Sequence, residues 1–320
     1  MHKERLLIID IWIAILMFIV IAGHCMFPFR PEWYTILHKW IYSFHMGNFF
    51  FISGFLFAYT YVPIHDLKKY WFYEKKKLLK FGLPFLFLGI AFTLFSVLRQ
   101  HLGIKGFIKG IIALFLDPTS SYVIYLWFIY VLFSLYLLAP LFVIDKRIKY
   151  LFLIISIILI FFPLPRLFSG HLFSRFLFFY LLGIICHEKS GLLKRVPVAI
   201  CWIAIFIFAY ISIFKSDKFP YAVTCLLSIP SLFWFSWMLN RFLCNKKWII
   251  YIQEVSRHCY AIYLYQMLFL NLLAILFKNI PHNSTSFFFF LFLGEILSIS
   301  GSILVHRALN FALSNSHKIV

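Results

Sequence analysis

Two histidines are placed where they could carry acid–base chemistry. His24 and His45 each interrupt a long uncharged stretch, at residues 11–29 and 40–65. A neutral imidazole can take a proton from a hydroxyl group as a general base. An ionisable side chain inside a membrane-spanning helix is costly and is a functional candidate there. The pair therefore predicts a polar reaction site, although polar residues are also common in outer helical turns that border water.

Three further residues are expected at the depth of these histidines. A first helix running outward from about residue 7 and a second running inward from about residue 40 would place Asn48 at this level too. Trp127 lies near the start of a fourth apolar stretch, and Arg175 near the start of a sixth. Separate parts of the sequence thus predict one outward-opening polar pocket.

Two acidic residues are also candidates. Glu295 lies in the middle of the stretch 286–306, where it would pair with a basic group or with a polar group such as Gln266, or join two helices by a hydrogen bond. Asp10 lies at the inner edge of the first stretch, where a carboxylate also suits the N-terminus of a helix.

A cluster of lysines follows the second stretch. Lys75, Lys76, Lys77 and Lys80 would attract a phosphate-rich cytoplasmic ligand, or would reflect membrane topology and attraction to anionic lipid. The sequence contains no glycine-rich phosphate loop, HExxH motif or GxSxG motif. These absences disfavour a nucleotide hydrolase, a metalloprotease and a serine hydrolase, and we expect no metal.

The composition requires lipid around these residues. Hydrophobic residues make up 63% of the 320 and charged residues 13%, whereas soluble domains carry about 25% charged residues. The net charge of +19 would suit a nucleic-acid binder only if it formed a basic face. The basic residues instead lie in short gaps between apolar stretches, so no nucleic-acid partner is expected. The six cysteines have no CxxC spacing and are interpreted as buried apolar residues.

The apolar stretches predict an all-α, polytopic membrane helical bundle with about ten transmembrane helices, because each crossing needs about 20 apolar residues. Eight stretches are uncharged and two contain one internal charge, Arg175 or Glu295. They are residues 11–29, 40–65, 81–98, 118–144, 150–165, 171–187, 196–214, 219–240, 258–277 and 286–306.

Lysine and arginine predict the orientation. With the N-terminus inside, 20 of the 30 basic residues fall in inner segments, and basic residues are retained preferentially in the cytoplasm. The chain is therefore predicted to be N-in/C-in, a single integral membrane domain over residues 1–320 with a core of about residues 5–305. The segment 99–118 is interpreted as an outer loop or an interfacial half-helix.

Several motifs resemble one family, the acyltransferase-3 type of membrane acyltransferases, and within it the bacterial sugar O-acetyltransferases that include fucose acetylation. The most specific is SFHMGNFFFISG at residues 43–54, similar to the family pattern FHMPLFFFxSG. Asp10 and His24 match the family's first helix, although Ile13 stands where a basic residue is usual. The other matches are the lysine cluster with Pro84, LWF at 126–128, YLLG at 180–183, and Ser256 to Gln266, where Gln266 replaces a histidine.

This resemblance implies transfer of acetyl from cytoplasmic acetyl-CoA, as acyl donor, to a hydroxyl of a surface or exported glycan or its lipid-linked sugar precursor. His24 would be the general base or acyl relay. The residues implied to bind substrate are His45, Asn48, Trp127, Arg175, Gln266 and Glu295. Those implied to bind the donor are Asp10, Lys75, Lys76, Lys77 and Lys80. The location would be the inner (cytoplasmic) membrane of a bacterium, as a multi-pass protein.

Two other functions are compatible with the same residues. A glycan exporter or transporter without chemistry would use His24, Arg175 and Glu295 to line a path or carry protons, but no inverted repeat supports it. A membrane subunit without catalytic activity is suggested by Ile13 and Gln266. If cells with a His24→Ala variant still export the glycan but the glycan lacks its acyl ester, the enzyme is favoured over the transporter.

Overall fold

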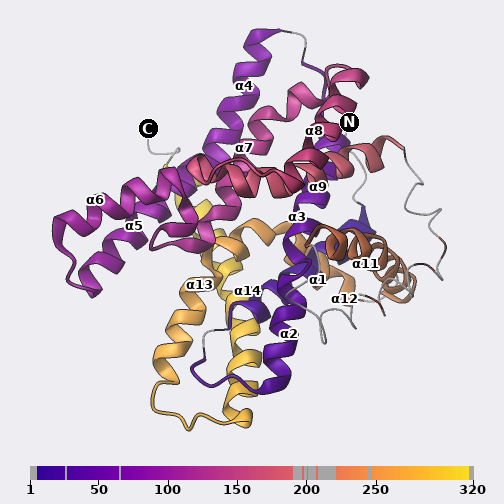
Figure 1. Ribbon diagram of the computed structural model, residues 1–320. Coiled ribbons are helices and arrows are strands. Elements are labelled where there is room, and N and C mark those ends of the chain that lie inside the picture. Colours follow the sequence, from indigo (N-terminus) through magenta and orange to yellow (C-terminus); the bar gives the residue numbers. More distant parts are fainter. Residues whose placement is uncertain are drawn as a thin grey trace. The chain divides into compact units, whose positions relative to one another are not determined.

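The computed structural model describes residues 6–25, 27–64, 66–189, 221–243 and 247–316, with positions 197, 200 and 207 (Figure 1). Over these residues the chain is helical and contains no strand. The helices are α1 (Leu7–Gly23), α2 (Glu32–Tyr42), α3 (His45–Thr60), α4 (Leu67–Lys77), α5 (Leu83–Arg99), α6 (Gly103–Leu116), α7 (Trp127–Phe142), α8 (Lys146–Phe161), α9 (Gly170–Glu188), α11 (Tyr221–Leu243), α12 (Trp248–Arg257), α13 (Cys259–Leu276) and α14 (Ser284–Ser316).

Local sequence explains several helix ends. The side chains of Asp66 and Asp145 accept hydrogen bonds from backbone N–H groups in the first turns of α4 and α8, which is how short acidic side chains stabilise a helix start. The hydrogen bond from the Lys69 N–H also holds the pKa of Asp66 below its usual range. A π-helical turn, Leu78–Gly82, joins α4 to α5, and Pro84 lies in the first turn of α5.

Contacts divide the chain into two compact units. The first comprises Met1–Phe49 and Gly191–Val320, and the second comprises Phe50–Ser190. The first unit thus holds α1, α2, the first turn of α3 and α11–α14. The second holds the rest of α3 and α4–α9.

Helix α1 is the centre of the first unit. It contacts α2, α11, α12, α13 and α14, and Trp12 and Leu16 have no exposed surface. Helices α13 and α14 run side by side, connected by a short loop (Figure 1). At the end of α1, the ring of Phe27 packs against Phe287 and Phe290 of α14 at centroid distances of 6.2 and 5.3 Å. A helix that contacts five others can hold its last residues in fixed positions.

Two glycines bring α3 and α9 together in the second unit. A Cβ atom on Gly54 would lie 1.9 Å from the carbonyl oxygen of Tyr180, and one on Gly183 would lie 2.0 Å from the carbonyl oxygen of Phe51. Glycine is therefore required at both positions, since small residues allow helix backbones in membranes to approach closely. Both glycines belong to motifs singled out in the sequence.

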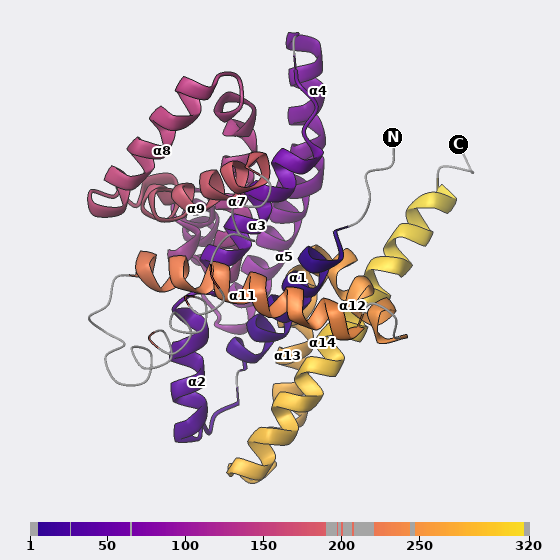
Figure 2. The same cartoon turned by 90° about the vertical axis from the view of Figure 1, so that its right-hand side faces the viewer.

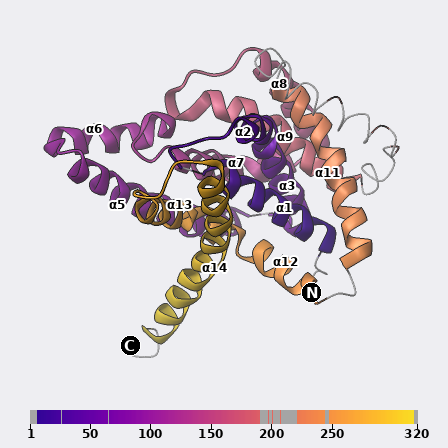
Figure 3. The same cartoon turned by 90° about the horizontal axis from the view of Figure 1, so that it is seen from below.

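Two other pairs of helices in the second unit are neighbours in sequence. Helices α5 and α6 lie side by side (Figure 3), as do α8 and α9. The pairing of α8 with α9 includes an ion pair between Lys149 and Glu188. The segment predicted as an outer loop or half-helix is thus the helix α6, packed on α5.

The predicted number of ten spans is not confirmed. Seven described helical segments are long and apolar enough to cross a membrane, and each overlaps a predicted stretch: Glu32–Thr60, Leu67–Arg99, Ile124–Phe142, Leu167–Glu188, Tyr221–Leu243, Cys259–Leu276 and Ser284–Phe311. Helices α1 and α8 correspond to two more but have only 17 and 16 residues. Most of the remaining stretch, 196–214, lies outside the described residues.

Candidate functional site

A break between α2 and α3 creates the setting of His45. The carbonyl oxygens of Ser43 and Phe44 at the break accept hydrogen bonds from side chains. The Thr224 hydroxyl of α11 donates to Ser43 at 2.6 Å, and the Asn48 amide donates to Phe44 at 3.1 Å. The Thr224 hydroxyl thus satisfies a carbonyl at the interruption of the helix, while the Phe44 carbonyl also accepts the backbone N–H of Asn48 at 3.3 Å. The second predicted span is therefore two helices, and His45 is the first residue of α3.

His45 is held in one orientation. Its side chain is buried, and Nδ1 lies 2.7 Å from the carbonyl oxygen of Ile41. Because a carbonyl only accepts, Nδ1 carries the proton, and a neutral ring then presents Nε2 as an acceptor. The Tyr42 ring lies 5.1 Å from the His45 ring and 6.4 Å from the His24 ring, measured between centroids. One tyrosine therefore separates the two predicted histidines, which the structure brings together.

His24 directly follows the last residue of α1, and polar side chains of α13 and α14 lie around it. It is half-buried, and its Nδ1 has no hydrogen-bond partner in the described chain. The fully buried Gln266 side chain of α13 lies within hydrogen-bonding reach of His24, although neither of its amide atoms has a partner at ordinary hydrogen-bond geometry. Glu295 of α14 lies against the Ala22 backbone, and its Oε2 is likewise buried and unpartnered. The three side chains converge from three helices.

His38 is a further member of this site that the sequence analysis missed. Its ring stacks on Tyr42 at 4.3 Å, and it interacts electrostatically with both His24 and His45. The sequence spacing could have identified His38, because residues 38, 42 and 45 are separated by four and three residues and so would share one face of a helix. The predicted span began at residue 40 and so left His38 outside it.

Asp10 serves packing in this structure. Its buried carboxylate accepts a 2.6 Å hydrogen bond from the Ser256 hydroxyl of α12. A second contact lies farther along the same helices: Gln266, ten residues after Ser256, lies beside His24, 14 residues after Asp10. Two contacts thus fix the register of α12 and α13 against α1. This explains why the motif that begins at Ser256 ends at Gln266.

The other predicted substrate-binding residues differ in their surroundings. The Asn48 amide also donates to the Ser228 hydroxyl of α11 at 2.7 Å, so it joins α3 to α11. Trp127 and Arg175 belong to the second unit. There Trp127 stacks on Phe176 at 5.4 Å, and Arg175 is exposed. Their placement with His24 stays a prediction.

A basic groove lies in the second unit, between the end of α3 and α4. It encloses about 480 Å³. The Lys77 Nζ lies 3.9 Å from the centre of the Tyr136 ring, and the Lys76 Nζ lies 4.3 Å from that of Phe72. The residues that line it are Phe57, Thr60, Tyr61, Val62, Pro63, Ile64, Lys69, Phe72, Tyr73, Lys76, Lys77 and Lys80.

The lysines of the basic groove differ in part from the predicted lysine cluster. Three of the four predicted lysines line the groove, Lys75 does not, and Lys69 joins them from the start of α4. The ammonium groups of Lys76, Lys77 and Lys80 lie over aromatic rings, whereas that of Lys69 pairs with Asp66. Together they form a site suited to an anion with a flat apolar part.

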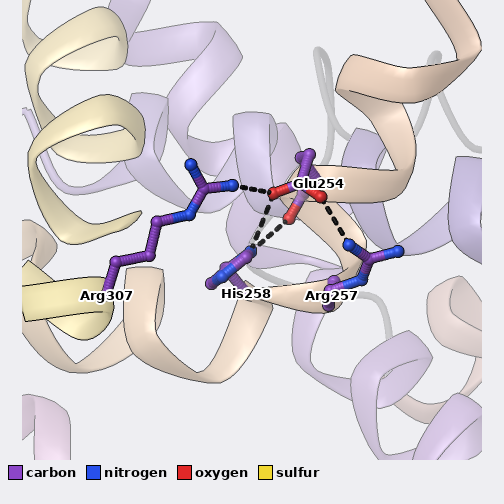
Figure 4. A network of polar contacts seen from close by, with 4 residues as sticks. All are labelled: Glu254, Arg257, His258 and Arg307. Carbon is purple, nitrogen blue, oxygen red and sulfur yellow. Dashed lines mark hydrogen bonds and ion pairs between the residues drawn. The ribbon is translucent and has the colours of Figure 1, made fainter. Parts of the chain in front are cut away.

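A second charged cluster joins α12, and the residue that follows it, to α14 in the first unit (Figure 4). Glu254 contacts the guanidinium groups of Arg257 and Arg307, each at 2.6 Å, and lies 3.5 Å from His258 Nδ1. The ring of His306 lies 5.4 Å from that of His258. The positive charge of the two arginines exceeds the charge of Glu254, so the cluster is basic.

Comparison with known proteins places the chain in a family. A family model described as an acyltransferase domain matches residues 6–307. No curated protein and no solved structure gives a significant match. The match covers His24, Gln266 and Glu295 together with the basic groove.

Proposed function

The chain belongs to the acyltransferase-3 family, and we propose that this multi-pass membrane acyltransferase moves acetyl from cytoplasmic acetyl-CoA to a hydroxyl of a surface or exported glycan. The observation that carries the proposal is the group of buried polar side chains around His24 that lack partners within the described chain. Such groups are rare in folded proteins and call for a bound molecule or water.

His24 is the proposed base. Its imidazole takes the proton of the acceptor hydroxyl as the oxygen attacks the thioester carbonyl. The C–O bond forms, the C–S bond breaks, and the proton passes from the imidazolium to the departing CoA sulfur. Overall, one thioester and one alcohol give one ester and one thiol.

The neighbours of His24 have distinct proposed roles. The amide of Gln266 donates to the carbonyl oxygen on which negative charge develops, an interaction strongest in the transition state. His45, fixed through Ile41, orients the acceptor hydroxyl. Asn48 holds α3 to α11 beside it. Arg175 holds an anionic part of the acceptor.

The donor phosphates are assigned to the basic groove. Ile13, which replaces the family's basic residue, is 6% exposed within the core of α1, so this position supplies no charge for the phosphates. Lys76, Lys77 and Lys80 supply it instead, by charge-assisted contacts. The expected location is the inner membrane of a bacterium.

The test compares cells carrying wild-type protein, His24→Ala or His24→Gln, with His101→Asn as the control. His101 is exposed and has a positive φ of 53°, which asparagine tolerates. Mass spectrometry then measures acyl esters on the surface glycan. We expect the ester to disappear in both His24 variants while the glycan remains outside. Retention of glycan in the cell would favour transport, and an unchanged ester would favour a subunit without catalysis.

A further inference from the structure

Two arginines of the first unit share one carboxylate and are exposed. Arg257 and Arg307 each place one nitrogen 2.6 Å from a carboxylate oxygen of Glu254, and their side chains are 58% and 60% exposed. Figure 4 shows the two guanidinium groups on opposite sides of this carboxylate. A guanidinium has five N–H donors, so each arginine keeps donors beyond the one that Glu254 takes. We call Arg257 and Arg307 the arginine pair, and its two positive charges exceed the one negative charge of Glu254.

The arginine pair lies at the end of the unit where α1 begins. Ser256, which precedes the first arginine, donates its hydroxyl hydrogen to Asp10 in the first turn of α1. Near the other end of α1, Glu295 of α14 lies against Ala22. Helix α14 then continues unbroken for 12 residues to Arg307 (Figure 2). Twelve residues also separate Ala22 from Asp10, and the two helices are in contact. Both routes thus lead to the level of Asp10.

The predicted orientation makes this end the inner one. With the N-terminus inside, most lysines and arginines fall in inner segments, where basic residues are preferentially retained. The cytoplasmic leaflet carries anionic lipid, and basic pockets between helices on that side bind lipid headgroups. A phosphate suits the arginine pair because each guanidinium can contact two of its oxygens with charge-assisted hydrogen bonds.

Exposed apolar side chains occur on both helices that carry the arginine pair. Leu304 and Phe311 lie three residues before and four residues after Arg307, so they share its face of α14, and both are largely exposed. On α12, Trp248 and Tyr251 are exposed, with their ring centroids 5.8 Å apart. Tryptophan and tyrosine are enriched where a membrane protein passes from hydrocarbon to headgroups. A free phosphate, which is polar throughout, would leave these side chains uncovered.

We propose that the arginine pair binds the headgroup of an anionic phospholipid, an inference that does not depend on the acyl transfer. The two guanidinium groups contact the lipid phosphate, one from α12 and one from α14. The acyl chains then follow the face of α14 that leads toward the bilayer centre, where Leu304, Leu297 and Leu293 are exposed at helical spacing. Glu254 already holds both guanidinium groups in place, so less side-chain freedom is lost on binding.

The experiment measures lipid binding to the purified full-length protein in detergent by native mass spectrometry. The probes are phosphatidylglycerol, which is anionic, and phosphatidylcholine, whose headgroup also carries a positive charge that the arginines repel. Wild type should bind phosphatidylglycerol more tightly. We expect Arg257→Gln and Arg307→Gln each to weaken phosphatidylglycerol binding about 5-fold. Arg307→Lys, which keeps the charge, should lose less.

Lys278→Gln is the matched control. Lys278 is exposed and follows Phe277, whose ring packs on Phe27 beyond the other end of α1. This variant also removes one positive charge from the first unit, and it should bind phosphatidylglycerol as wild type does. Equal thermal unfolding midpoints of all variants without added lipid show that weaker binding does not come from unfolding.

Other results would overturn the inference. Arginine variants that bind phosphatidylglycerol as tightly as wild type would do so, and so would an equal loss in Lys278→Gln. Glycerol phosphate, which has no acyl chains, should not compete; competition as strong as that of the lipid would mean a site for free phosphate. If acetyl-CoA displaces the lipid and binds both arginine variants more weakly, the arginine pair belongs to the acyl donor. That last result would leave the proposed function standing.

Discussion

Replacing Gly54 by alanine should separate two helices of the second unit. The added Cβ would lie 1.9 Å from the Tyr180 carbonyl oxygen, and ordinary contact begins at 3.4 Å. Helices α3 and α9 must therefore part by about 1.5 Å, the difference between these distances. The obstacle is backbone, which cannot rotate away. Overpacking of this kind costs about 1–3 kcal/mol.

The assay is thermal unfolding of the purified protein in detergent. We expect Gly54→Ala and Gly183→Ala each to lower the midpoint by roughly 2–10 °C. Both glycines lie in the same helix contact, so the double variant should lose less than the sum of the two losses.

Gly82→Ala is the matched control, because its nearest obstacle is the tip of the 47% exposed Leu78 side chain. Leu78 can turn away, so no fall is expected. Midpoints at the wild-type value for both Gly54→Ala and Gly183→Ala would refute the close contact of α3 and α9.

Three other variants test other parts of the structure. Ser256→Ala should lower the free energy of unfolding by about 1–3 kcal/mol, because buried Asp10 loses a donor; chemical unfolding measures it, and Ser256→Thr should recover part. Glu254→Gln should change that free energy by about 1 kcal/mol or less, since both of its arginine partners are largely exposed; a larger loss would contradict this assignment. Lys76→Gln with Lys80→Gln should weaken CoA binding and reduce its salt dependence, seen by calorimetry at two salt concentrations.

Much of the helical framework could be predicted from hydropathy alone. Long apolar stretches predict helices because lipid leaves each backbone group to be satisfied within its own segment. The break at Ser43 and Phe44 could not be predicted in this way. It contains neither proline nor glycine, and its Ser43 carbonyl accepts a hydrogen bond from Thr224 of α11, 181 residues away.

The site was predicted in part. The position of each histidine along its apolar stretch predicts its depth in the membrane. The predicted depths of His24 and His45 agreed, and this was enough to predict that the two lie near each other. The partner of Asp10 is Ser256, 246 residues away, so no local pattern reveals that this carboxylate serves packing. His38 was missed because hydropathy placed the start of its span too late.

The central claim is that His24 carries acyl transfer, and one measurement tests it directly. Membranes containing wild-type or His24→Ala protein receive acetyl-CoA labelled in the acetyl group, and the label in the extracted glycan is counted. The account predicts labelled glycan with wild type and background label with His24→Ala. Equal label in both samples would contradict it.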